Sequence, residues 1–372
     1  MRGAWLAMSC ACLLLPLPPS PVAALPPRDI SLTFIGDIMG HDVNYHMSDF
    51  RDIYRGVQQV FLSDGLTFAN LEFPVDSTRP EAGYPYFNGT SQYVRAALEA
   101  GVDAFSLANN HAFDGGEAGI FQTIRALQRL ADLEGWPLLL SGVRGNPRRP
   151  FLPSTRVVRG IRVGFLAVTQ FLNERDSGRY VDVVDYDDGD ASDRFLRRVH
   201  DLVPSYDLFI VSYHGDREYI GEPSPRKTAF FHRLLEAGVD IVFSHHPHVV
   251  QGFEVVRVGG ASRLIMYSMG NFISGMTWRA DPDPRAPFAA TGEGYMLSVA
   301  VRCTDMGCAV RRVEPLPIAN YRNGRGEMVV AFMRDLASGA VPLAPSWRAY
   351  YVARLERMER WLSRFPPAGA PD

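Results

Sequence analysis

Short apolar runs recur along this chain, and six of them end in a cluster of polar side chains. Each run has the length and the β-branched and aromatic residues of a β-strand. The clusters that follow the runs contain Asp37, then Asn70 and Glu72, then Asn110 and His111, then His214, then His245, His246 and His248, and finally Asn271.

Helical patterns separate several of these runs, at residues 91–100, 116–133, 192–202 and 224–237. Strands that alternate with helices form a largely parallel sheet, in which functional residues gather at the carboxyl ends of the strands. We therefore expect an α/β fold in which the six polar clusters converge in space, although they are scattered along the sequence.

The last third of the chain has a different pattern. Alternating runs flank Gly259 and Gly260, and residues 294–314 repeat this arrangement, so both segments are predicted to be antiparallel hairpins. Residues 275–293 between them are rich in Pro, Asp and Gly, which predicts a long loop near the polar clusters. Residues 347–364 have an Arg-rich amphipathic pattern, which predicts a helix that packs on the surface or binds a partner.

The first 24 residues have the plan of a secretory signal. Arg2 precedes an apolar stretch from Ala4 to about Leu17, and the segment ends in the small residues Ala23 and Ala24. The apolar stretch is shorter than the ~20 residues of a membrane span. We therefore expect cleavage near Ala24 and an exported chain, periplasmic or secreted. The alternative is an uncleaved segment that anchors the protein.

Cleavage would leave two cysteines, Cys303 and Cys308, in the mature chain. They flank a turn-like Thr-Asp-Met-Gly sequence between two strand-like runs. An export route permits a disulfide, so we expect the pair to close a hairpin. Two free thiols are the alternative.

Composition narrows the class of protein. Of the 372 residues, 47% are hydrophobic and 21% are charged, which is typical of a globular protein. The formal net charge of −3 disfavours a nucleic-acid partner, because such proteins carry a strongly basic domain or stripe. Lys227 is the only lysine, which the base composition of the genome explains more simply than an arginine-based site.

The polar clusters have the composition of a metal site. Six of the nine histidines lie in or beside them, together with carboxylates. Imidazole and carboxylate ligands suit divalent Mn, Fe or Zn. Six candidate ligands are too many for one tetrahedral ion and fit two ions that share a carboxylate, an arrangement suited to phosphoryl transfer. These ligands are Asp37, Glu72, Asn110, His214, His246 and His248. The alternative is that the histidines are buried and merely hydrogen-bonded.

Five motifs carry a family resemblance. In order, GDIM, NLEFP, SLANNHAFDGG, SHHPHVVQGFE and YSMGNF resemble the CapA family of poly-γ-glutamate capsule biosynthesis, within the calcineurin-like metallophosphatase superfamily. The resemblance runs from about Ser31 to Pro317. It implies a four-layer metallophosphoesterase-like sandwich, with two mixed β-sheets flanked by helices. We divide the chain into a signal peptide (1–24), a CapA-like domain (29–318) and a C-terminal extension with the amphipathic helix (319–372).

The resemblance also implies roles for individual residues. Asp37 matches the first metal carboxylate, and Glu72 stands where the superfamily has its bridging aspartate. His111 is expected to face the substrate as general acid or charge stabiliser, and Asp114 to orient its imidazole. The remaining expected ligands are Asn110, His214, His246 and His248.

The chain also departs from the superfamily pattern. Met39 stands where the first motif has a histidine, which puts a full dinuclear site in question unless His41 replaces it. Three residues are therefore candidates for either metal binding or support of the ligands: His41, Asn70 and His245. Glu218 and Asn271 are expected to bind substrate or to support the ligands.

Two functions follow from these expectations. The first is an exported metal-dependent phosphoesterase, or a related hydrolase, that acts on an envelope polymer or a phosphorylated precursor. The second is a non-enzymatic component that binds the polymer or takes part in a membrane synthase or export complex, with a structural metal site. A fold alone does not decide between them.

The N-terminal pattern makes a first testable prediction. Mass spectrometry of the native protein should find a mature N-terminus near Leu25, because the apolar stretch is too short to be retained as a comfortable span. Detection of residues 1–20 intact in a membrane fraction would contradict cleavage and support the anchored alternative.

Overall fold

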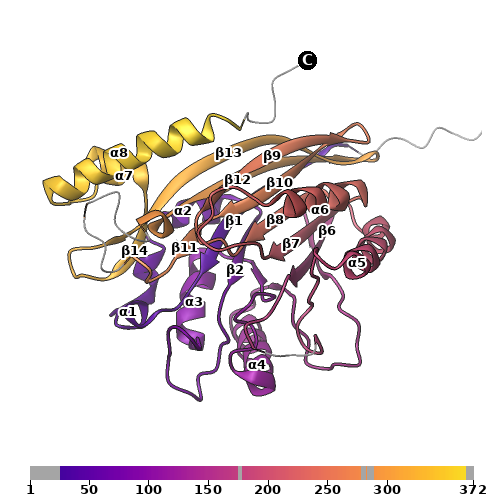
Figure 1. The fold of residues 1–372 in the computed structure, drawn as a ribbon, viewed down its shortest axis with the longest axis horizontal. Coiled ribbons are helices and arrows are strands. Elements are labelled where there is room, and N and C mark those ends of the chain that lie inside the picture. The colour runs from indigo at the N-terminus through magenta and orange to yellow at the C-terminus, as the bar shows by residue number, and fades with distance from the viewer. Residues whose placement is uncertain (1–25, 175–177, 278–281, 283–288, 366–372) are drawn as a thin grey trace, which may run out of the picture.

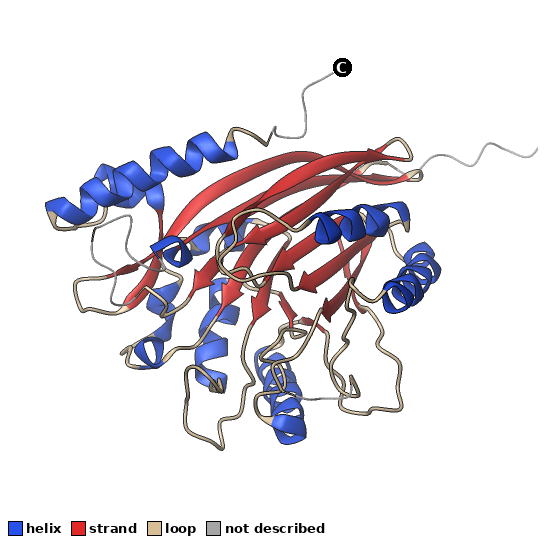
Figure 2. Cartoon of the chain, viewed as in Figure 1, coloured by secondary structure: helices blue, strands red, loops and turns tan. Residues whose placement is uncertain are grey.

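The computed structural model describes residues 26–174, 178–277, 282 and 289–365. The predicted signal peptide and most of the predicted loop at 275–293 lie outside the described residues. Two mixed β-sheets pack face to face, and helices cover their outer faces (Figures 1 and 2). The predicted four-layer α/β sandwich is therefore confirmed.

The larger sheet has eight strands, in the order β14-β13-β12-β1-β2-β3-β4, with β11 beside β1. Strands β1 to β4 are parallel, whereas β12, β13 and β14 are antiparallel. The hairpin predicted around 294–314 is confirmed as β12 and β13. The strands are β1 (Arg28–Ile38), β2 (Leu66–Leu71), β3 (Ala104–Ser106), β4 (Leu139–Ser141), β11 (Asn271–Ile273), β12 (Glu293–Thr304), β13 (Gly307–Arg322) and β14 (Met328–Phe332).

The smaller sheet has six strands, in the order β5-β6-β7-β8-β10-β9. Strands β6, β7, β8 and β10 are parallel, and the turn at Gly259 and Gly260 joins β9 to β10 as predicted. The strands are β5 (Ser154–Val158), β6 (Ile161–Thr169), β7 (Leu208–His214), β8 (Ile241–His245), β9 (Val250–Val258) and β10 (Ala261–Met269).

The four helices predicted between the strands are present. They are α3 (Ser91–Ala100), α4 (Gly116–Glu134), α5 (Gly189–Leu202) and α6 (Pro225–Glu236). The start of α5 was predicted three residues too late, because the Asp188 side chain accepts a hydrogen bond from the Ala191 N–H at 3.0 Å and caps the first turn. Helices α3 and α4 cover the larger sheet, and α5 and α6 cover the smaller one.

Shorter helices and the C-terminal helix complete the chain. The helix predicted at 347–364 is α8 (Pro345–Leu362) and buries Tyr350, Tyr351, Arg354 and Met358 on one face. Its Arg354 forms a buried ion pair with Glu293 at the start of β12. None of the helices among the described residues has the length and apolar character to cross a membrane. The remaining helices are α1 (Asp42–Tyr45), α2 (Gln58–Ser63) and α7 (Met333–Ser338), with 3-10 turns at Phe50–Ile53, Val203–Ser205 and Ala289–Gly292.

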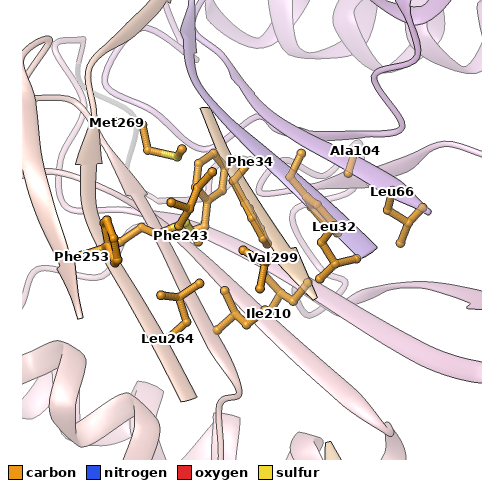
Figure 3. Close-up of a cluster of buried hydrophobic side chains, with 14 of the residues drawn as sticks. Leu32, Phe34, Leu66, Ala104, Ile210, Phe243, Phe253, Leu264, Met269 and Val299 are labelled. Carbon is orange, nitrogen blue, oxygen red and sulfur yellow. The ribbon is translucent and has the colours of Figure 1, made fainter. Parts of the chain in front are cut away.

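The main hydrophobic core lies between the two sheets (Figure 3). Phe34 on β1 contacts Phe243 on β8, with ring centroids 5.3 Å apart, and both side chains are fully buried. Ile35, the next residue of β1, faces the helices on the other side of the sheet. Because both faces of the central strands are covered, their sequences are largely apolar, and the carboxylate, amide and imidazole side chains of the polar clusters lie where the strands end.

The cysteine pair closes the β12–β13 hairpin as predicted. Cys303 and Cys308 face each other in the strand register and form a disulfide. The loop between them is short, so the bond removes little entropy from the unfolded chain.

Removal of this disulfide should therefore cost little stability. We expect the Cys303→Ser, Cys308→Ser double variant to lose no more than roughly 2–3 kcal/mol in a denaturant titration, because the stabilisation grows with loop length. Quantitative alkylation of both thiols in unreduced protein from the periplasm would show instead that the pair is free.

Candidate metal centre

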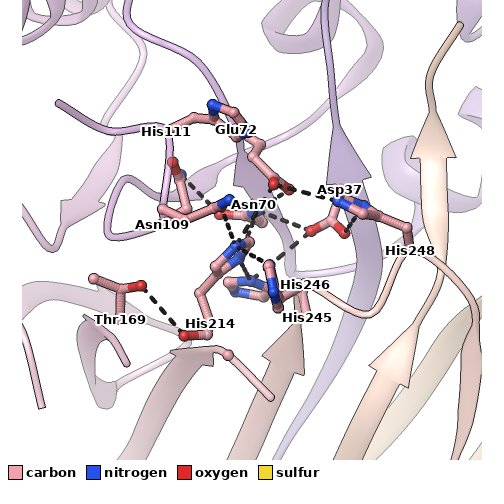
Figure 4. A network of polar contacts seen from close by, with 12 residues as sticks. Asp37, Asn70, Glu72, Asn109, His111, Thr169, His214, His245, His246 and His248 are labelled. Atoms are coloured by element: carbon pink, nitrogen blue, oxygen red, sulfur yellow. Dashed lines mark hydrogen bonds and ion pairs between the residues drawn. The ribbon is translucent and has the colours of Figure 1, made fainter. Parts of the chain in front are cut away.

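The polar clusters converge where the carboxyl ends of strands from both sheets meet (Figure 4). Asp37 lies at the end of β1, and Asn70 and Glu72 lie at the end of β2. From the smaller sheet, His214 ends β7 and His245 ends β8. This arrangement follows from the parallel order of the central strands, whose ends share one edge.

Two glycines bring the sheets together at this edge. The Asp37 N–H donates a hydrogen bond to the Gly270 carbonyl oxygen at 3.2 Å, and a Cβ at Gly36 would collide with that oxygen. Gly270 itself has φ +71°, which favours glycine. The crossing from β10 to β11 therefore places Asn271 beside Asp37 in the strand register.

Asp37, Glu72 and His248 form the first group of donor atoms. His248 Nδ1 lies 3.3 Å from Asp37 Oδ2, and His248 Nε2 lies 3.7 Å from Glu72 Oε1. His248 Nδ1 also donates to Asn271 Oδ1 at 2.9 Å. A hydrogen bond of this kind orients most metal-bound histidines. Burial lowers the pKa of His248, but its contact with the Asp37 carboxylate outweighs burial and raises the pKa above its usual value.

Glu72, His214 and His246 form the second group. His214 Nε2 lies 2.7 Å from Asn110 Oδ1, 3.0 Å from His246 Nδ1 and 3.6 Å from Glu72 Oε1. Glu72 belongs to both groups, which is the position of a carboxylate shared by two ions. All six predicted ligands are thus brought together.

The buried charges of the two groups fit a cation. Asp37 and Glu72 are fully buried, and Asp37 Oδ2 and Glu72 Oε1 accept no hydrogen bond. Burial, together with the neighbouring Asp37, raises the pKa of Glu72 well above its usual value. Burial and the neighbouring histidines lower the pKa of His214 and His246, so both imidazoles stay neutral and offer lone pairs. These residues could therefore hold one or two divalent metal ions.

Asn70 and His245 contact the side chains of the donor groups through their polar atoms. Asn70 Nδ2 donates to Asp37 Oδ1 at 2.8 Å and to Glu72 Oε2 at 3.1 Å. His245 contacts Ser212 Oγ through Nε2 and His214 through Nδ1, both at 2.7 Å. His245 Nδ1 also lies 3.8 Å from Asp37 Oδ1, so the geometry admits either of the two roles expected for this residue. Burial lowers the pKa of His245 to about 3.

His111 lies apart from the donor groups, in the cleft above them. The cleft has a volume of about 540 Å³, and its lining includes His41, Phe87, His111, Asn173 and Glu218. His111 Nδ1 contacts Asp114 Oδ2 at 2.8 Å, and Phe87 N–H donates to the same oxygen at 2.8 Å. Asp114 therefore fixes the orientation of the His111 imidazole.

The other candidates have distinct places. His41 lines the cleft and accepts a hydrogen bond from Gly275 N–H at 3.1 Å, but it joins none of the donor groups found among the described residues. Met39 lines the same cleft. Asn271 is fully buried behind His248, where it orients that ring rather than facing the cleft. Glu218 lines the cleft and approaches His246 and His248.

Two asparagines of the site were missed in the sequence. Asn109 Nδ2 donates to Asn70 Oδ1 at 3.2 Å and to the Leu71 carbonyl oxygen at 2.8 Å, and its place beside Asn110 could have marked it. Asn173 Nδ2 lies 3.3 Å from His111 Nε2. It follows β6, a strand that was not predicted, so no pattern identified it.

Lys227 lies buried beneath the site. Its Nζ donates to the Tyr267 carbonyl oxygen at 2.7 Å, to Gln251 Oε1 at 3.2 Å and to the Gly215 carbonyl oxygen at 3.4 Å. Burial lowers the pKa of Lys227 to about 7. The ammonium group thus donates its hydrogen bonds to Gly215, which follows β7, and to residues of β9 and β10.

Comparisons with known proteins identify relatives of this chain. The family model described as "Bacterial capsule synthesis protein PGA_cap" matches residues 31–276. The capsule biosynthesis protein CapA of Bacillus anthracis is 28% identical over 312 residues, which cover 80% of this chain and 70% of that protein. The PGA biosynthesis protein CapA of Bacillus subtilis (strain 168) is 24% identical over 264 residues, or 68% and 66% of the two chains. A solved hypothetical protein from Thermus thermophilus is 19% identical, with a TM-score of 0.44, over 77% of this chain and 98% of that one.

The two facing mixed sheets and the shared-carboxylate donor set place the protein in the calcineurin-like metallophosphoesterase superfamily. Within it, the match over residues 31–276 shows that the chain belongs to the PGA_cap family of bacterial capsule synthesis proteins, as the five sequence motifs indicated.

The separation of donors from cleft residues predicts different effects for two histidines. His246→Ala should lose metal, because even supporting residues typically change metal affinity by about 10–100-fold. His111→Ala should retain metal, because His111 belongs to no donor group among the described residues. Metal content and melting temperature, measured with and without chelator, test both variants. An empty site in His111→Ala with a full site in His246→Ala would reverse the assigned roles.

Proposed function

We propose that this protein is an exported, metal-dependent phosphoesterase-type hydrolase of capsule or poly-γ-glutamate biosynthesis. The proposal rests on one juxtaposition: a buried carboxylate and imidazole donor set lies directly below a cleft that contains the His111–Asp114 pair. Metal ligands beside a proton donor are the parts that acid-assisted hydrolysis of a phosphoester uses.

The donor set would hold the metal ions, which we expect to be Mn, Fe or Zn. Bound there, the ions would supply Lewis-acid stabilisation of charge on a phosphoryl oxygen. Asn70 would keep the Asp37 and Glu72 carboxylates oriented, since its amide donates to both.

His111 would supply the proton. Its Nδ1 lies 2.8 Å from the Asp114 carboxylate, which fixes the orientation of the ring and leaves Nε2 to act on the cleft side. In the reaction, a water molecule would attack the phosphorus atom, and the Nε2 proton would pass to the leaving oxygen as the P–O ester bond breaks. Asn173, whose amide lies beside Nε2, would contact the same leaving group.

The substrate would be an envelope polymer or a phosphorylated precursor of one. The names of the two Bacillus relatives concern capsule and PGA biosynthesis, and they support this class of substrate. The Cys303–Cys308 disulfide supports an exported protein, because disulfides persist outside the reducing cytosol. An exported protein could also act together with a membrane synthase or export complex.

One observation favours a second function, a non-enzymatic polymer-binding or assembly component with a structural metal site. Met39 occupies the position of a superfamily metal ligand and is only 1% exposed. A thioether is a poor ligand for hard metals, so one of the two metal positions has a weaker protein donor set.

An assay with metal control separates the two functions. Mn-loaded protein should hydrolyse members of a panel of aryl phosphate mono- and diesters, lose turnover with chelator and regain it with Mn. His111→Ala should lower turnover by about 10²–10⁴-fold while metal content stays unchanged. His232→Ala is the matched control, because His232 pairs with Glu254 on the surface away from the cleft. Retained metal without turnover on any ester would favour the binding function.

A further inference from the structure

Backbone strain is concentrated beside the metal centre. Among the described residues, five that are not glycine have positive φ, and four of them lie in two segments that touch: Asp216 (+91°), Tyr219 (+62°), His246 (+104°) and His248 (+57°). Such conformations are unfavourable for residues other than glycine and persist where the surroundings impose them. The surroundings therefore determine the conformation of both the turn 216–219 and the histidine loop 246–248.

Specific contacts fix both ends of this turn. The Asp216 N–H donates to Gln170 Oε1 at 2.8 Å, and Asp216 Oδ2 accepts from the Ser224 N–H at 2.8 Å. At the other end, the Tyr219 N–H donates to the Pro247 carbonyl oxygen at 2.8 Å. Pro247 lies between His246 and His248, so the turn is bound directly to the loop that carries these two donors.

Glu218 lies between the two anchors. One of its carboxylate oxygens lies within 4.8 Å of a ring nitrogen of His246 and of His248. Glu72, which is fully buried, belongs to one donor group with His246 and to another with His248. Glu218 is exposed and lines the cleft. The two carboxylates therefore approach the histidines from the interior and from the cleft.

We propose that Glu218 is a metal ligand that binds from the cleft side and supplies the donor that Met39 does not provide. This inference rests on the metal site of the proposed function. A carboxylate oxygen is a hard donor that suits Mn, Fe and Zn better than a thioether. Because Glu218 is exposed whereas Asp37 and Glu72 are buried, it is also the carboxylate that an incoming anionic group can displace.

Glu218→Gln tests the proposal through metal binding alone. The substitution keeps the size of the side chain and removes its charge. In calorimetric titrations with Mn²⁺, we expect wild-type protein to bind the metal, and Glu218→Gln to bind it about 10–100-fold more weakly at one position. The melting temperature in chelator should change little, because Glu218 is exposed and the substitution keeps the size of its side chain.

Glu174→Gln is the matched control. Glu174 lines the same cleft but belongs to no donor group among the described residues, so its variant should bind Mn²⁺ like the wild type. Wild-type affinity in Glu218→Gln would overturn the proposal while leaving the metal site intact. Failure of the wild-type protein itself to bind Mn²⁺ would instead overturn the metal site of the proposed function.

Discussion

The burial of two carboxylates, Asp37 and Glu72, is the constraint on which the rest of the site depends. An ionised carboxylate removed from water costs many kcal/mol unless opposite charge or hydrogen bonds compensate it. Asn70 satisfies one oxygen of each, and the other two oxygens have no hydrogen-bond partner. The surrounding imidazoles of His214 and His246 are held neutral by their own burial, so they offer lone pairs rather than charge. His248 Nδ1 lies 3.3 Å from the second Asp37 oxygen, and a divalent metal ion bound here could satisfy both kinds of donor together.

This constraint also explains why the two sheets must approach so closely. The donors come from both sheets, and neither sheet alone carries a complete set. The contact between Gly36 and Gly270 joins the end of β1 to the crossing from β10. A side chain at Gly36 would collide with the Gly270 carbonyl oxygen, and a side chain at Gly270 would collide with the Glu293 carbonyl oxygen. The close packing of the two sheets at this edge therefore also brings the residues of the site together.

The functional residues at the strand ends could be predicted from the sequence. The contacts made by the segments that connect the strands could not. Asp37, Glu72 and His214 could be predicted because carboxylate and imidazole side chains are rare inside a buried strand, which makes them conspicuous where the strand ends. Asn173 could not, because its strand carries no polar cluster and its contact with His111 depends on tertiary packing. The approach of Glu218 to the histidine loop depends on positive φ at Asp216 and Tyr219. The residue types at these two positions do not predict a positive φ. The start of α5 was missed because a cap bond at Asp188 outweighed the helical periodicity.

The position of Lys227 has a practical consequence. It is the only lysine of the chain, and its side chain is fully buried with all three donors directed to acceptors. Amine-reactive dyes, biotin esters and cross-linkers therefore find no accessible side-chain amine on the folded protein.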